Sequence, residues 1–157
     1  MLARRWLMAL FVIQAGAASG SAATKVANQV ASTSTKPCII VGLDITFDGT
    51  TATNTPIEMQ LSSPTAAGSG GSTFTPLLVS AESSATSSCT ARVNDTTAGA
   101  SPSLYAAYYV PPTSGFVYQF PLGREVDLLI SDFLEWKVVT VSGSGTPNYR
   151  GQIWFVE

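Results

Sequence analysis

The sequence predicts an all-β protein: an antiparallel, jelly-roll-like β-sandwich of about eight strands. Apolar and polar residues alternate with a period of two in one run after another, which is typical of half-buried strands. Turn-forming residues separate these runs, and no window after residue 30 has the spacing of an amphipathic helix. Short strands divided by regular turns are typical of sandwiches and jelly rolls. At 157 residues the chain has the length of one domain, with an N-terminal segment at 1–23 and a sandwich at 24–157.

The N-terminal segment has two interpretations. Arg4 and Arg5 precede the apolar run "WLMALFVI", and the small residues Ala15-Gly16-Ala17 follow it. This order of a basic head, an apolar middle and a small-residue site favours a secretory signal. The apolar run is too short to span a bilayer, which takes about 20 residues. The alternative is an arm or strand that packs on a neighbouring subunit.

The strands of the body follow from the alternation, and the turns between them contain Gly, Pro or Asp. The expected strands are "CIIVGLDITF" (38–47), "PIEMQL" (56–61), "SCTARV" (88–93), "LYAAYYV" (104–110), "GFVYQFP" (115–121), "EVDLLIS" (125–131), "EWKVVTV" (135–141) and "YRGQIWFV" (149–156). The tightest expected turn is "FPLGRE", with Gly123 at a positive φ.

One face of each alternating run is expected to build the core. Burying one such aliphatic side chain contributes about 1.5–3 kcal/mol. The predicted core residues are Ile39, Val41, Leu43, Ile45, Met59, Phe116, Tyr118, Phe120, Leu128, Ile130 and Trp136.

The composition argues against several classes of function. The chain has no histidine, which removes the usual general base and zinc ligand. After residue 30, five scattered basic residues face ten acidic ones, so the body lacks the basic patch that nucleic acid or an anionic membrane requires. Cys38 and Cys89 are too few for a zinc site and form either one disulfide or, the favoured alternative, two buried thiols.

The same residues predict a protein that is not an enzyme. Without histidine a Ser-His-Asp triad is impossible. Glu125 and Asp127 share one strand face, but alternating acids more often mark the solvent side of a strand. We therefore expect no catalytic residue, no cofactor and no metal ligand.

The glycine-rich stretch "TAAGSGGSTFTP" (65–76) resembles a phosphate-binding loop only superficially. Such loops lead into a helix and usually carry a lysine beside the final Ser or Thr. Here "STFTPLLVS" follows, with β-branched residues and Pro76, and no lysine. The stretch is expected to connect two strands.

The long polar tract from Ser80 to Ser103 is expected to be a loop spread over the surface of a partner.

Two strands break the alternation and predict an interface. In "LYAAYYV" Tyr105 and Tyr109 make the second face as apolar as the first, and Trp154 does the same in the last strand. A two-layer sandwich covers only one face of each strand, and Tyr and Trp are frequent at interface hot spots. We expect Tyr105, Tyr109 and Trp154 to contact another subunit, with Arg124 paired to a carboxylate of a neighbouring chain. The alternative is that the tract from Ser80 to Ser103 covers the second face within one chain.

Residues 24–157 also carry a resemblance. The stretches that carry it are "KPCIIVGLDITFDGTTATNTPIEMQL", "TAAGSGGSTFTPL", "YYVPPTSGFVYQFPLGREV" and the aromatic ending "IWFVE". In their order they resemble the small β-rich virion proteins of tailed bacteriophages, of the capsid decoration or cement type.

That resemblance implies a non-enzymatic structural protein located in the virion. Its implied partners are the major capsid protein or other virion proteins, and copies of itself, with a homotrimer favoured over a dimer. The alternative is a secreted β-sandwich that binds carbohydrate or protein after its signal is cleaved.

Overall fold

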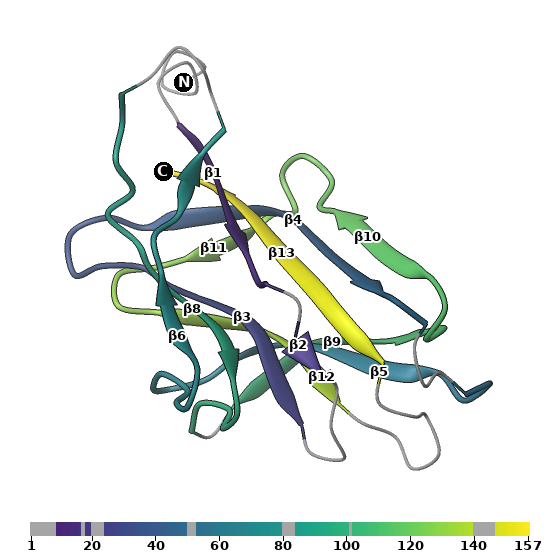
Figure 1. The fold of residues 1–157 in the computed structure, drawn as a ribbon. Coiled ribbons are helices and arrows are strands. Elements are labelled where there is room, and N and C mark those ends of the chain that lie inside the picture. Colours follow the sequence, from purple (N-terminus) through teal and green to yellow (C-terminus); the bar gives the residue numbers. More distant parts are fainter. Residues whose placement is uncertain are drawn as a thin grey trace.

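The computed structural model of the chain is an antiparallel β-sandwich of two sheets, which confirms the predicted fold class (Figure 1). The structure describes residues 9–16, 18–19, 24–49, 53–79, 84–100, 102–139 and 147–157. Within these ranges it contains thirteen strands and no helix, so the expected eight strands are too few. The jelly-roll-like character stays a prediction.

The first sheet has seven strands. Five of them lie side by side in the order β10 (Gly115–Gln119), β4 (Cys38–Phe47), β13 (Asn148–Val156), β1 (Leu10–Gln14) and β7 (Leu77–Leu78). The other two are short: β11 (Val126–Leu128) pairs with β4, and β2 (Ala18–Ser19) pairs with β13.

The second sheet has six strands. Their order is β6 (Ser72–Phe74), β8 (Thr90–Asp95), β3 (Lys25–Ala31), β12 (Phe133–Val139), β5 (Ile57–Ser63) and β9 (Ser103–Val110).

The chain crosses between the sheets at both sides of the sandwich. At one side β9, an edge of the six-stranded sheet, leads directly into β10, an edge of the seven-stranded sheet. A turn closed by Ser114 N–H donating to Pro111 O (3.2 Å) joins them. At the other side β6 leads into β7 in the same way. Each side of the sandwich therefore presents two neighbouring strand edges.

The core between the sheets is centred on Trp136 of β12. Its ring is fully buried, and its indole N–H donates to the backbone carbonyl of Asp44 on β4 (3.2 Å). This hydrogen bond links the two sheets and satisfies the polar atom of a buried Trp, which would otherwise be costly. Leu43, Ile45, Met59, Leu128 and Trp136 are buried as predicted.

A β-bulge in β4 overturns the prediction for Ile39 and Val41. Gly42 pairs with Trp154 on β13, but the next pair is Ile40 with Phe155, so Val41 is skipped in the pairing with β13. One extra residue reverses the alternation. Ile40 is therefore 0% exposed, whereas Ile39 and Val41 are only half-buried on the other face.

Ile130 is 54% exposed, so its predicted place in the core is wrong. The strand that carries Leu128 ends at that residue, and a turn follows in which Ser131 has φ 64°. The other three predicted core residues, Phe116, Tyr118 and Phe120, share one face but are only half-buried.

Part of the predicted N-terminal segment belongs to the sandwich. Strand β1 pairs with β13 over five residues, and Phe11, Ile13 and Ala15 lie in the core. Phe11 stacks on Phe155 with ring centroids 5.6 Å apart. The sheet thus includes residues before 24, where the sequence placed the start of the sandwich.

Some expectations fall outside the described residues. These are the basic head Arg4-Arg5, Ala17 of the small-residue site, residues 80–83 and 101 of the polar tract, and residues 140–141 of the expected strand 135–141. Signal and arm both stay predictions for the N-terminal segment.

The carboxylate of Glu157, directly after β13, holds the segment that enters β8. It accepts hydrogen bonds from Ser87 Oγ (2.5 Å), Ser88 N (3.0 Å), Ser88 Oγ (2.9 Å) and Cys89 N (2.9 Å). Burial alone would raise the pKa of Glu157, but these donors outweigh it and lower the pKa to about 2. This part of the Ser80–Ser103 tract therefore packs on its own chain.

We predict that Ile13→Ala destabilises the protein by about 2–5 kcal/mol, because it removes a fully buried side chain of β1 from the core. Urea unfolding measures the loss. The matched control is Val12→Ala, a half-buried position on the opposite face of the same strand, which should cost less than about 1 kcal/mol. Equal costs for the two variants would contradict the place of β1 in the sandwich.

The turn at Gly123 generates a second prediction. Gly123 has φ 83°, as the sequence predicted, and Arg124 N–H closes the turn on Pro121 O (2.9 Å). A Cβ at this position meets no atom within 4 Å, so only the backbone conformation opposes a side chain.

Gly123→Val should therefore cost about 1–2 kcal/mol or more, and Gly123→Ala about 1 kcal/mol. Gly16 is an ideal comparison because it also has open space but no positive φ, so Gly16→Ala should be neutral or slightly stabilising. Thermal melting measures the difference between Gly123→Ala and Gly16→Ala. An unchanged melting temperature in Gly123→Val would refute the turn assignment.

Candidate functional site

Exposed apolar side chains gather at the β9–β10 side of the sandwich. Tyr105 and Tyr109 of β9 are 56% and 70% exposed, and Leu104 is exposed beside them. Val117 of the neighbouring strand β10 is 78% exposed too, but it faces the outer side of the seven-stranded sheet, away from the outer face of β9. Isolated exposed apolar residues are normal, but a group on one edge strand is typical of an interaction surface. We call Leu104, Tyr105 and Tyr109 the apolar edge.

A group of aromatic rings fills the space between the sheets behind the apolar edge. The Tyr108 ring of β9 lies 4.6 Å from that of Phe116 and 5.8 Å from that of Tyr118, both on β10. Phe120 makes an edge contact with Tyr118 at 4.9 Å, and Trp136 lies 6.0 Å from Phe116. Burial raises the pKa of the Tyr108 hydroxyl, and the nearby Tyr118 adds to the rise. These rings hold the two edge strands in place.

The structure confirms that Tyr105 and Tyr109 lie outside the core of the single chain. They project from the outer face of β9, opposite the inward face that carries Tyr108 and the buried Val110. The described part of the Ser80–Ser103 tract does not cover them, since both remain more than half exposed. Contact with another subunit stays a prediction.

The other two predicted interface residues lie elsewhere. Trp154 is half-buried on the outer face of β13 in the seven-stranded sheet, and its indole N–H donates to Asp44 Oδ2 (3.2 Å). Arg124 is exposed in the turn between β10 and β11. The structure therefore brings Tyr105 and Tyr109 together and leaves Trp154 and Arg124 apart from them.

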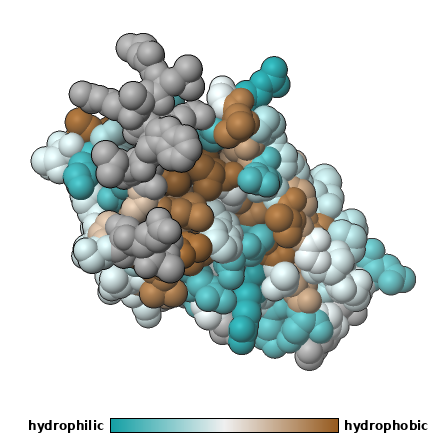
Figure 2. Space-filling model, turned by 90° about the horizontal axis from the view of Figure 1, so that it is seen from above, coloured by the Kyte–Doolittle hydropathy of each residue, from teal (hydrophilic) through white to brown (hydrophobic). Residues whose placement is uncertain are grey.

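Trp154 instead forms one wall of a hollow of about 310 Å³ on the outer face of the seven-stranded sheet. Figure 2, seen from above, shows apolar side chains on this side of the molecule with hydrophilic ones among them. The lining residues are Leu10, Val41, Gly42, Leu43, Asp44, Val117, Tyr118, Gln119 and Trp154.

Sequence reasoning missed this hollow, although Gly42 in the middle of a strand was a signal for it. Glycine inside a strand often marks a bulge or a place where another group approaches closely. A Cβ at Gly42 would lie 3.8 Å from Trp154 Cβ, so a larger side chain would extend over the Trp154 ring. The bulge at Val41 and the absent side chain at Gly42 together open the space.

Asp44 supplies a carboxylate at the wall of the hollow. Burial raises its pKa, while the hydrogen bond from Trp154 opposes the rise. The hollow thus combines an aromatic ring, aliphatic side chains, one carboxylate and the Gln119 amide. Such a set can hold a small ligand that has both apolar and hydroxyl groups.

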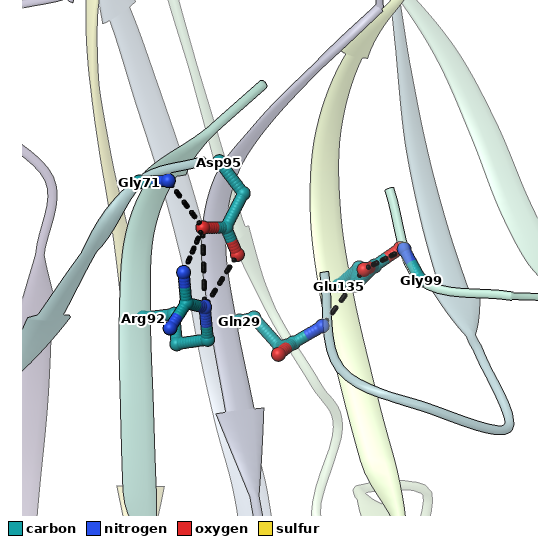
Figure 3. Close-up of polar contacts among 6 residues, drawn as sticks. All are labelled: Gln29, Gly71, Arg92, Asp95, Gly99 and Glu135. Atoms are coloured by element: carbon teal, nitrogen blue, oxygen red, sulfur yellow. Dashed lines mark hydrogen bonds and ion pairs between the residues drawn. The ribbon is translucent and has the colours of Figure 1, made fainter. Parts of the chain in front are cut away.

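A cluster of polar side chains lies on the outer face of the six-stranded sheet (Figure 3). Its members Gln29, Asp95 and Glu135 are buried, whereas Arg92 is partly exposed. Arg92 Nη2 pairs with Asp95 Oδ1 at 2.8 Å, and Gly71 N–H donates to the same oxygen at 2.9 Å. Two donors, Gln29 Nε2 and the Gly99 N–H, each lie 2.7 Å from Glu135 Oε1. Burial raises the pKa of Glu135, whereas these two hydrogen bonds and the positive charge of Lys137 lower it, and the effect of burial is the larger one.

The glycine-rich stretch closes over this polar cluster and, as expected, connects two strands, β5 and β6. A Cβ at Gly71 would lie 2.3 Å from Val93 O, and one at Gly68 would lie 2.6 Å from Thr97 O. Neither space admits a side chain, so the glycines permit close backbone packing. The amide of Gly71 does bind an anion, but that anion is the Asp95 carboxylate of the same chain.

No family model, no curated protein and no solved structure matches this chain. Among the described residues no three His, Cys, Asp or Glu side chains are grouped as metal ligands. The described part of the chain also has no helix long and apolar enough to cross a membrane. The functional interpretation of the apolar edge and of the hollow at Trp154 therefore rests on the geometry described above.

Proposed function

We propose that this chain is a non-enzymatic structural protein of a phage virion, which decorates or cements the capsid through protein–protein contacts. The observation that carries the proposal is the apolar edge, where Tyr105 and Tyr109 are exposed on an edge strand. The resemblance of residues 24–157 to decoration and cement proteins supplies the virion context. The partner is the major capsid protein or another virion protein.

The apolar edge suits a protein partner for two physical reasons. Tyrosine offers a large, rigid contact area with a polar tip, so it loses little conformational entropy on binding. Strands β9 and β10 each have one side without a strand neighbour in the sheets described here, and unpaired backbone groups at an edge can accept a further strand.

Self-association belongs to the same proposal, with a homotrimer favoured. In a closed ring each chain uses one surface against a different surface of its neighbour. The apolar edge would be one of these surfaces, and the exposed Arg124, in the turn after β10, would pair with a carboxylate of the adjacent chain. An exposed ion pair adds only about 0–1 kcal/mol, so the tyrosines supply most of the affinity.

We predict that the double variant Tyr105→Ser, Tyr109→Ser keeps its fold but binds undecorated capsids of the encoding phage at least tenfold more weakly. Each truncated hot-spot tyrosine typically costs 1–2 kcal/mol or more of binding free energy, and tenfold corresponds to 1.4 kcal/mol. Co-sedimentation with capsids measures binding, and sedimentation velocity of the free protein measures its association.

The matched control is Leu77→Ser, which also removes an exposed apolar side chain but lies on β7, at the other side of the sandwich. It should leave both measurements unchanged. Equal binding by the double variant and the wild type would reject the apolar edge as the contact surface.

The hollow at Trp154 favours a second candidate, a secreted β-sandwich that binds carbohydrate. Sugars present C–H faces that pack on aromatic rings and hydroxyl groups that donate to carboxylates. Trp154, Asp44 and Gln119 provide these groups within one hollow of about 310 Å³, large enough for a small ligand.

For this candidate we predict that a binding oligosaccharide changes the tryptophan fluorescence and that Asp44→Asn weakens binding about tenfold, because a charged acceptor becomes neutral. Asp127→Asn is the control, since this exposed carboxylate lies on the same sheet and outside the hollow. A panel of neutral, amino and acidic oligosaccharides without any fluorescence response would eliminate the carbohydrate candidate.

A further inference from the structure

Two cysteines from different sheets lie in the same core. Cys38 is the first residue of β4 in the seven-stranded sheet, and Cys89 directly precedes β8 in the six-stranded sheet. Both are buried, both belong to the same hydrophobic core, and both are free thiols in this structure.

The strand register brings both cysteines close to one residue, Glu157. On β13, Phe155 pairs with Ile40 and Val156 pairs with Ile39, so Glu157 follows beside Cys38. The Glu157 carboxylate in turn accepts a hydrogen bond from the backbone N–H of Cys89 at 2.9 Å. The end of β13 therefore lies beside both cysteines, although they belong to different sheets.

These surroundings do not suit a reactive thiol. The hydrogen bond with Cys38, burial and the nearby Glu157 carboxylate all raise the pKa of the Cys89 thiol. A nucleophilic or redox-catalytic cysteine needs the opposite, a low pKa beside positive charge and access to solvent. What the geometry does offer is two buried cysteines, one from each sheet, in the same core and beside the same residue, Glu157.

We propose that Cys38 and Cys89 form an intrachain disulfide when the chain folds in an oxidising medium, and that this bond ties the two sheets together. A cross-link between these positions closes a loop of about 50 residues, and loops of this length restrict the unfolded chain strongly. This proposal is independent of the partner that the apolar edge or the hollow binds.

The oxidant is a low-molecular-weight disulfide such as glutathione disulfide. The thiolate of one cysteine attacks it, forming a mixed disulfide and releasing one glutathione thiolate. The second cysteine thiolate then attacks the protein sulfur of the mixed disulfide and releases the second glutathione thiolate. Two protein thiols lose two electrons, glutathione disulfide gains them, and the two thiol protons end on the two glutathione molecules.

The bond forms during folding rather than afterwards. In the closed sandwich Cys38 is fully buried and Cys89 nearly so, which keeps a glutathione-sized oxidant away from both sulfur atoms. Once formed, the bond is equally protected from reductants. Folding in a reducing medium and folding in an oxidising medium therefore give two proteins that differ only in this bond.

The experiment uses the full chain, unfolded in denaturant with reductant. It is refolded in two portions, one with an excess of glutathione disulfide and one with reduced dithiothreitol. Intact-mass measurement should show the oxidised portion lighter by two hydrogen atoms, and a peptide map should join the Cys38 and Cys89 peptides. The melting temperature of the oxidised portion should be about 5–15 °C higher.

The matched control is Cys89→Ala, which removes one sulfur and keeps a small apolar residue. Its melting temperature should be the same after both refolding conditions. The comparison of the two wild-type portions stands on its own if this variant fails to fold.

Three results would overturn the proposal. One is two free thiols in the protein refolded with glutathione disulfide, and another is a stable glutathione adduct on either cysteine. The third is a disulfide between two chains, which non-reducing electrophoresis detects as a dimer.

Discussion

The pairing of β4 with β13, with its bulge at Val41, is the interaction on which the rest of the structure depends. This pairing covers the centre of the seven-stranded sheet, and its bulge decides which residues face inward. It turns Ile40 into the core and leaves Trp154 and Asp44 on the outer face, where the hollow opens. It also places Glu157 beside Cys38, so one irregularity in a ladder positions both a candidate ligand site and a candidate cross-link.

The fold class was predictable because alternation is a local property of the sequence. Residues such as Leu43, Met59 and Trp136 alternate with polar neighbours, and all three are buried. The errors have non-local causes. Gly42 in "CIIVGLDITF" indicates an irregularity, but the residue that β13 skips, Val41, depends on the partner strand. Ile130 continues an apolar alternation, yet its strand ends at Leu128 where the chain turns back toward β12.

The candidate sites were predictable to different degrees. A strand apolar on both faces indicated exposed tyrosines. Tyr105 and Tyr109 are exposed because β9 is an edge strand and no described segment covers these two side chains. The same reasoning placed Trp154 with them, although β13 lies in the other sheet. Gly42 alone was a signal for the hollow, but its lining could not be predicted, since it combines Gly42, Asp44 and Trp154 from two strands with Val117 and Gln119 from a third. These lining residues are far apart in the sequence, so their proximity can be recognised only once the order of the strands in the sheet is known.

The position of β1 has a consequence for how the chain acquires its structure during synthesis. Leu10 pairs with Val156, so β1 leaves the ribosome long before its main partner exists. Contacts of such high sequence separation carry a large loop-closure cost and slow folding. Until β13 emerges, Phe11 and Ile13 lack the strand that covers them in the folded protein. Exposed apolar strands of this kind bind chaperones or other nascent chains. The seven-stranded sheet can therefore close only after translation of β13.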